Sequence, residues 1–428
     1  MNYIRKQAKK LAELIVSIKV GFFLAVRQLR RSSFWTTGLI IFVMTLTFLN
    51  LVVVSGILVG LIQGATDAVR ERYISDVIII PLKNKDRIEN SQAILATART
   101  LPWAEAVSGR YSQGGLIEAN YKNKIRATDV SDEANTTFAG VNLEDENAVT
   151  DIESLIIEGS FIRPTDYDEV VVGSMLLKKY FPDEVQGFAT LDHVAVGDKV
   201  RVTLGGNTRE VRVKGIIKAK VDEISRRVFF TEKQFRDMAG INDFNYTEIS
   251  IKAKDPADST KIRDALKGSG YDTYAQIKTF DESKPKFLND LVTTFNMLGN
   301  AISSIGLAVA SITTFIVIFI NAITRRKFIG IMKGIGISEE AIEFSYVFQS
   351  IFYAIGGSLF GLALLYGVLR PYFDANPIDF PFSDGILAVT TLGVSVRVAI
   401  MIITTIIAGY IPARLITKKN TLDSILGR

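Results

Sequence analysis

The chain has 428 residues, of which 48% are hydrophobic and 22% are charged. This composition is too apolar for an ordinary soluble protein and too charged for a chain lying wholly within lipid, so we expect one membrane part and one aqueous part. The absence of cysteine excludes disulfides, thiolate metal sites and cysteine nucleophiles, and the single histidine, His193, cannot form a zinc site alone.

The net charge of +5 is unevenly distributed along the chain. Residues 1–33 carry eight Lys or Arg residues and one Glu, and further basic clusters lie in 324–342 and 412–428. A nucleic-acid-binding protein would gather its positive charge on one folded domain. Here the charge flanks apolar segments, as the cytoplasmic ends of membrane spans do. We therefore expect membrane lipids and no nucleic acid among the partners, and both termini in the cytoplasm of a plasma-membrane protein.

The N-terminal segment, residues 1–34, places apolar side chains at helical spacing, with basic residues between them. This pattern predicts an amphipathic helix on the cytoplasmic membrane surface. The alternative is a disordered basic leader up to about residue 17, followed by a juxtamembrane turn. The uncharged run within 34–62 predicts the first span, and because the helical pattern continues, we assign 35–72 as transmembrane helix and stalk.

Residues 73–286 predict a water-soluble α+β domain. Strand-like runs include Val77–Pro81 and Glu169–Gly173, and Gly205-Gly206-Asn207 is a hairpin signal between two further runs. We interpret the acidic run 144–146 as a solvated loop and not as a catalytic pair. Because the flanking spans begin or end on the cytoplasmic side, this domain is predicted to be extracytoplasmic.

The second span and its stalk, residues 287–323, are unusually long. A helix of this length measures roughly 55 Å, which exceeds one bilayer. Asn296, Asn300 and Ser304 fall near one face of it, and polar or small residues there favour helix packing in lipid. A substrate path along this face is the alternative.

A short basic elbow, residues 324–342, separates the second span from the third. A segment this short and this charged cannot lie in hydrocarbon, and its Lys and Arg residues predict a cytoplasmic position. After Gly336, Ser338 is suited to cap a new helix. We interpret the segment as an elbow presented to a soluble partner, and the alternative is a tight loop with stop-transfer charges.

The third span is predicted at 343–370, the outer loop at 371–385, the fourth span at 386–411 and a cytoplasmic tail at 412–428. Gly357 and Gly361 have the spacing that permits close helix contact. Arg397 is an intramembrane charge that we expect to be paired or snorkelling, or to lie at the outer interface if the span starts late. Pro412 is predicted to close the span. The fold class is thus an α-helical membrane protein with four transmembrane helices in a 1+3 arrangement and a large inserted α+β domain.

The sequence contains no phosphate-binding loop, no H-E-x-x-H zinc motif and no G-x-S-x-G nucleophile motif. We therefore expect a non-catalytic chain with no cofactor and no metal, in which ATP hydrolysis, if any, occurs in another subunit. A membrane-bound enzyme with an external active site is disfavoured.

Three segments, in this order and spacing, resemble the MacB-type ABC transporter permeases, which include LolC, LolE and FtsX proteins. They are the basic entry Ala25–Phe34, the elbow from Arg325 to Ser338, and the Gly409–Arg414 end of the last span with the 421–428 tail. The core of the extracytoplasmic domain, from Glu158 onward, is also similar to that family. The elbow departs from the family pattern at Phe328, where the family usually has Glu. A charge contact made by that Glu is therefore not expected in this chain.

The resemblance implies a permease that forms a homodimer or heterodimer and binds a cytoplasmic ABC ATPase subunit. It implies that ATP-driven closure reaches the outer domain through the long helices, by mechanotransmission, for efflux or for handling lipoprotein or lipid substrates. An extracytoplasmic adaptor or hydrolase would be a further partner. The elbow residues that we expect to dock on the ATPase are Arg325, Lys327, Ile329, Gly330, Ile331, Lys333, Gly334, Ile335, Gly336 and Ser338.

An alternative function is that of an FtsX-like regulator without transport, whose outer domain activates a cell-wall hydrolase or senses a ligand. The sequence leaves both functions open, because both use the same membrane architecture.

Overall fold

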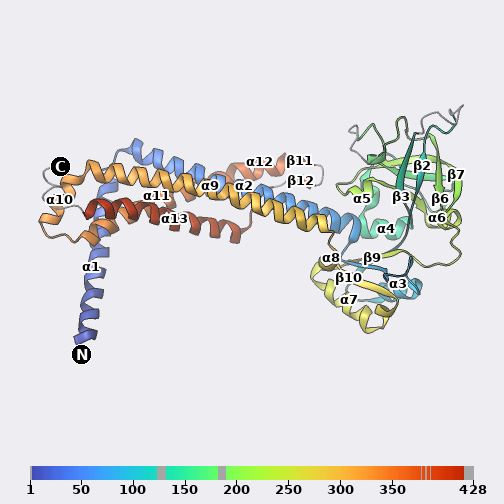
Figure 1. Cartoon of the computed structure of the whole chain (residues 1–428), viewed down its shortest axis with the longest axis horizontal. Helices are drawn as coiled ribbons and strands as arrows, with labels where there is room; N and C mark the ends of the chain where they lie inside the picture. Colours follow the sequence, from blue (N-terminus) through green and yellow to red (C-terminus); the bar gives the residue numbers. More distant parts are fainter. Residues whose placement is uncertain are drawn as a thin grey trace. The chain divides into compact units, whose positions relative to one another are not determined.

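The computed structural model describes residues 2–122, 132–181, 189–376, 378–380, 383–385 and 387–418. They form two compact units, which we call the helical unit (residues 1–62, 291–379 and 384–428) and the sheet domain (residues 63–290 and 380–383). Figure 1 shows the elements of both units, coloured along the sequence.

Two long helices, α2 (Phe34–Val69) and α9 (Lys286–Thr324), run from one unit into the other. The other elements of the helical unit are α1 (Asn2–Arg30), α10 (Arg326–Gly334), α11 (Glu339–Leu364), the π-helical turn η6 (Leu365–Leu369), α12 (Arg370–Ala375), α13 (Thr391–Thr417), and the short strands β11 (Ile378–Phe380) and β12 (Ser383–Gly385).

Within the described residues, four helical segments are long and apolar enough to cross a membrane by length and composition. They are Phe34–Ile74, Lys286–Thr324, Glu339–Ala375 and Thr391–Thr417. Helix α11 lies against both α1 and α13, and its Gly357 and Gly361 lie against Met44 and Phe48 of α2. Because glycine has no side chain, the two helices approach closely there.

The last helix differs from its prediction at both ends. It begins at Thr391, where the Thr390 hydroxyl accepts a hydrogen bond from the Gly393 amide at 3.1 Å, and it continues to Thr417. Pro412 therefore lies inside α13 and does not end it. Proline removes one helical hydrogen bond, and such a loss is tolerated in helices whose neighbours pack closely, as around the buried Pro412.

The sheet domain holds one large mixed sheet with the strand order β10-β1-β9-β2-β3-β8-β5-β7-β4, and β6 pairs with β2 and β7. Its strands are β1 (Val77–Pro81), β2 (Ala104–Glu118), β3 (Glu133–Val141), β4 (Ile156–Gly159), β5 (Glu169–Gly173), β6 (Lys199–Leu204), β7 (Asn207–Ile217), β8 (Arg227–Thr231), β9 (Glu248–Ala253) and β10 (Ala275–Thr279).

Helices and single turns connect these strands. They are η1 (Arg70–Ile74), α3 (Ser91–Thr100), α4 (Leu143–Thr150), η2 (Ile152–Leu155), η3 (Ser174–Leu176), α5 (Asp222–Ser225), α6 (Glu232–Ala239), η4 (Pro256–Asp258), α7 (Ser259–Gly268), η5 (Tyr271–Thr273) and α8 (Phe280–Ser283).

The predicted strands β1 and β5 have the expected bounds, and Gly205-Gly206 forms the expected tight hairpin, with Leu204 paired to Asn207. The longest strand, β2, was not predicted. It contains Gly109, Gly114 and Gly115, which weaken a strand signal because glycine adds no side chain to a sheet. Its place between β9 and β3 compensates for that weakness through pairing on both sides.

The ends of the two long helices are part of the core of the sheet domain. Ala65 and Val69 of α2 and Leu288 of α9 are buried in one cluster with Phe229 and Phe280. This burial anchors both helices on the sheet, since a fully buried Val or Leu side chain, such as Val69 or Leu288, contributes about 1.5–3 kcal/mol of transfer free energy.

Candidate functional site

The elbow is a short helix held between two turns. Helix α9 ends at Thr324, and Arg325 leaves helical geometry before α10 begins. After α10 the chain turns at Gly336, whose φ of +93° suits glycine. The Ser338 hydroxyl then accepts a hydrogen bond from the Ala341 amide at 3.2 Å, so the predicted cap of the next helix is confirmed.

One side of the elbow exposes a row of large apolar side chains. Phe328 is 66% exposed, Ile331 51% and Ile335 74%. They follow one another at the three- and four-residue spacing that puts residues on one helical face. Lys327 is exposed beside Phe328. We call Lys327, Phe328, Ile331 and Ile335 the elbow face.

Three predicted docking residues belong instead to the support of the elbow. Ile329 is 1% exposed and packs in a core cluster with Ala413 and Ile416 of α13, and Gly330 is also buried. The Lys333 ammonium donates to the Thr417 carbonyl oxygen at 2.8 Å and pairs with Glu339 at 2.7 Å. Lys333 and Ile329 therefore fix α10 to its neighbours in the single chain.

The other predicted docking residues lie at the surface to different degrees. Gly334, Gly336 and Ser338 are exposed, and Arg325 is half-buried. Phe328 is not among the predicted docking residues, because it departs from the family pattern at its position. Its helical spacing to Ile331 and Ile335 was the signal that would have identified it.

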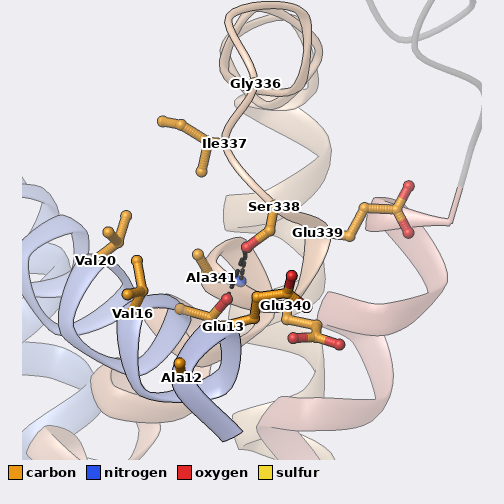
Figure 2. Close-up of a pocket in the computed structure, with 11 residues that line it drawn as sticks. Ala12, Glu13, Val16, Val20, Gly336, Ile337, Ser338, Glu339, Glu340 and Ala341 are labelled. Atoms are coloured by element: carbon orange, nitrogen blue, oxygen red, sulfur yellow. Dashed lines mark hydrogen bonds between the residues drawn. The ribbon is translucent and has the colours of Figure 1, made fainter. Parts of the chain in front are cut away.

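A cavity of about 790 Å³ lies between α1 and the turn that joins α10 to α11. It is lined by Ala12, Glu13, Val16, Ser17, Val20, Gly336, Ile337, Ser338, Glu339, Glu340 and Ala341. Figure 2 shows the side chains of Glu13 and Glu340 close to Ser338. The hydroxyl oxygens of Ser17 and Ser338 are 2.9 Å apart and join the two walls. We call this cavity the elbow pocket.

The three predicted packing residues of α9 are exposed in the single chain. Asn296, Asn300 and Ser304 do not form the contact with α2. A neighbouring face of α9 makes that contact. There the hydroxyl oxygens of Ser303 and Ser55 are 3.3 Å apart, and Gly306 lies close to the Asn50 side chain.

Arg397 is half-buried near the start of α13 and has no carboxylate partner among the described residues. Its Nε donates to the Leu51 carbonyl oxygen of α2 at 3.1 Å, and its Nη1 donates to Gly393 at 2.9 Å. The side chain is therefore paired with backbone carbonyl oxygens, one of them on another helix.

The described part of the sheet domain contains no cluster of three or more His, Cys, Asp or Glu side chains able to hold a metal ion. The acidic run 144–146 is not the solvated loop that we expected. It forms the first turn of α4, and Glu146 is buried against Arg110 of β2. This pair ties α4 to the sheet.

Two family models match the chain. The MacB-like periplasmic core domain matches residues 42–269, just over half of the sequence, and the FtsX-like permease C-terminal domain matches residues 300–421. The second match includes the elbow and ends at residue 421, beyond the described residues.

Two curated relatives are uncharacterized ABC transporter permeases of Methanocaldococcus jannaschii. MJ1507 is 25% identical over 64% of this chain and 65% of its own length, and MJ0797 is 24% identical over 40% of this chain and 46% of its own. The chain thus spans less than two thirds of either relative.

Two solved structures also show similarity. The extracellular domain of the noncanonic ABC-type transporter YknZ from Gram-positive bacteria has a TM-score of 0.32 and 12% identity, covering 47% of this chain and 98% of that one. The periplasmic region of MacB from Actinobacillus actinomycetemcomitans has a TM-score of 0.34 and 14% identity, covering 50% of this chain and 92% of that one.

The first match covers residues 63–269 of the sheet domain, and the second match includes the elbow. The chain belongs to the family of ABC transporter permeases with a MacB-like periplasmic core domain and an FtsX-like C-terminal domain.

Proposed function

We propose that this chain is the non-catalytic permease subunit of an ABC transporter in the plasma membrane. The elbow docks on a separate cytoplasmic ATPase, and ATP hydrolysis there moves the extracytoplasmic sheet domain, for efflux or for handling lipid-type substrates. The observation that carries this proposal is the elbow face, which presents three large apolar side chains at the end of a membrane helix.

The elbow face has the character of a protein-docking surface. Phe328, Ile331 and Ile335 are each more than half exposed, and such a contiguous apolar row is costly in water unless a partner covers it. Basic residues flank the row, which excludes burial of the whole elbow in hydrocarbon. A groove in a soluble subunit, apolar at its base and acidic at its rim, fits this surface.

The junction between α2 and the sheet supports a mechanical role for the long helices. Arg70 donates to Asp76 at 2.7 Å, and Asp76 in turn accepts from the Ala253 amide of β9 at 2.8 Å. Arg72 donates to the Thr150 carbonyl oxygen and to Asp151. With these bonds in place, a displacement of the end of α2 moves the sheet and is not absorbed by a flexible loop.

A second copy of the chain is the partner that we propose for the exposed polar row of α9. Asn296, Asn300 and Ser304 lie on a membrane helix without a contact from α2, and amide and hydroxyl groups in lipid favour a helix that accepts their hydrogen bonds. Because the chain has no cysteine, Asn300→Cys provides a unique thiol. We expect oxidative cross-linking of dimers at this position and none for Val309→Cys, which lies on the opposite face.

The docking proposal is tested by purifying the full-length chain in mild detergent and identifying the proteins that remain bound. We expect a stoichiometric ABC ATPase whose ATP hydrolysis co-elutes with the permease. Ile335→Asp places a charge in the elbow face and should reduce the bound ATPase at least about tenfold, as loss of an apolar hot spot does. Ile157→Asp, at an exposed position of the sheet domain, is the matched control. Equal ATPase recovery with both variants would refute docking at the elbow face.

A further inference from the structure

The elbow pocket is preformed, because α1 is fixed in place along α11. A Cβ atom on Gly21 would lie 2.7 Å from the Phe344 Cβ and 2.8 Å from the Ala341 carbonyl oxygen, so only glycine permits this approach. The rings of Phe22 and Phe348 meet edge to face at 5.4 Å between centroids. The close contact of α1 with α11 therefore forms one wall of the pocket.

The charge of the pocket is opposite to that of the surrounding elbow. Three carboxylates line it, from Glu13, Glu339 and Glu340. Glu339 is paired with Lys333, which is also held by the Thr417 carbonyl oxygen. In the part of the chain that the structure describes, neither Glu13 nor Glu340 forms an ion pair. Among the side chains that the structure describes, these two carboxylates thus have no cation at ion-pair distance.

The lining of the pocket contains aliphatic side chains as well as carboxylates. Val16, Val20 and Ile337 line it together with the carboxylates, and Figure 2 shows them around the same opening. A Lys or Arg side chain has the matching construction, with a methylene stem that packs on apolar surface and a cationic head that pairs with carboxylates.

We propose that the elbow pocket receives a Lys or Arg side chain of the ATPase subunit. This inference rests on the proposed function and extends it, since it assigns a second contact with chemistry opposite to that of the elbow face. The pocket residues 336–341 directly follow Ile335 in the sequence. A partner that contacts Ile335 is therefore next to the pocket. Two contacts of opposite charge fix the register of docking, which one basic surface alone does not.

Two other occupants fit the charges less well. The cytoplasmic leaflet of a membrane carries negative charge, which the carboxylates of Glu13 and Glu340 repel. A second copy of this chain would have to insert one of its own basic side chains. In the elbow, Lys333 already forms an ion pair with Glu339 of its own chain. The ATPase remains the occupant to which the position of the pocket points.

The first experiment measures binding of the ATPase that co-purifies with the wild-type chain to permease variants in detergent, over a range of salt concentrations. The double variant Glu13→Gln/Glu340→Gln should weaken binding at least about tenfold near 0.15 M salt, and the difference should shrink as salt screens the wild-type contact. The double variant Glu144→Gln/Glu153→Gln removes two exposed carboxylates from the sheet domain and is the control. Equal affinity and equal salt dependence of the double variant and the wild type would overturn the proposal.

The second experiment maps the occupant directly. Ala12→Cys puts the only thiol of the chain at the pocket, where benzophenone maleimide can be attached and photoactivated in the assembled complex. We expect a cross-link to an ATPase peptide containing Lys or Arg, and none from Leu11→Cys, whose 63% exposed side chain lies on the other face of α1. A cross-link to a second permease copy or to lipid would overturn the assignment.

The two proposals fail in different ways. If Ile335→Asp loses the ATPase while the double Gln variant binds it as the wild type does, docking at the elbow face stands and the pocket assignment falls. If the wild-type chain binds no ATPase, both fall.

Discussion

The guanidinium of Arg110 and the carboxylate of Glu146 form a two-point ion pair, in which both side chains are only 2% exposed. The Arg110 Nε lies 2.7 Å from Oε2 of Glu146, and its Nη2 lies 2.8 Å from Oε1. The third nitrogen, Nη1, donates to the Tyr73 carbonyl oxygen at 2.6 Å. One buried arginine thus connects strand β2, helix α4 and the turn η1 at the end of the first long helix.

Breaking this pair from one side should be strongly destabilising. Glu146→Gln removes the paired counter-charge of the buried guanidinium, and we expect a loss of about 3–5 kcal/mol in the free energy of unfolding. Thermal unfolding of the purified full-length protein measures it. Glu144→Gln, two residues away in the same helix but exposed, should change stability by less than about 0.5 kcal/mol. Similar unfolding temperatures for the two variants would contradict the structural role of the pair.

The same pair should make stability depend on acid. Burial by itself raises the pKa of Glu146, but attraction to Arg110 and hydrogen bonds from Arg110, Ser108 and Thr150 outweigh it and hold the pKa below the ordinary 4.5. A carboxylate with a lowered pKa contributes its stability above about pH 4.5, and that contribution is lost as the pH falls through the folded-state value. The stability difference between the wild type and Glu146→Gln should therefore narrow below pH 4.5. A difference independent of pH between 7 and 3 would disprove this linkage.

Close packing of α2 on α11 should make one glycine intolerant of a methyl group. A Cβ atom on Gly357 would lie 2.9 Å from the Met44 carbonyl carbon and 3.0 Å from the Thr45 amide nitrogen, both of them backbone atoms that cannot rotate away. We expect Gly357→Ala to cost about 1–3 kcal/mol, as overpacking does, measured as thermal unfolding in detergent. Gly367→Ala, in η6 of the same continuous helix, meets no atom within 4 Å and is the control.

The bond of Arg397 to α2 predicts a modest structural effect. Arg397→Met removes the hydrogen bond to the Leu51 carbonyl oxygen, and interhelical hydrogen bonds in membranes contribute about 0.6 kcal/mol and at most about 1.7. The free energy of unfolding, measured by thermal unfolding, should fall by an amount within that range, while the amount of bound ATPase stays unchanged. Ser395→Ala, whose hydroxyl bonds only within its own helix, is the comparison. Lost coupling between ATP hydrolysis and transport at unchanged stability would instead give Arg397 a functional role.

The sequence by itself determined the features that depend on local chemistry. Apolar run length located the long apolar helices, because a span must satisfy its backbone hydrogen bonds internally and match the bilayer. Gly205-Gly206 located a hairpin and Ser338 a helix cap, because each needs only its immediate neighbours. The predicted end of the last helix, at Pro412, differs from the observed end at Thr417. Proline favours a helix end locally, but packing keeps this helix intact.

Only the tertiary structure decided which polar and apolar residues are available to partners. Glu146 is buried because Arg110, 36 positions earlier in the chain, supplies its counter-charge. Ile329 and Lys333 are covered by α13, which lies more than 80 positions further along. The elbow pocket joins residues 12–20 to residues 336–341. Burial and pocket formation are set by contacts between distant segments, and no local pattern records which segments will meet.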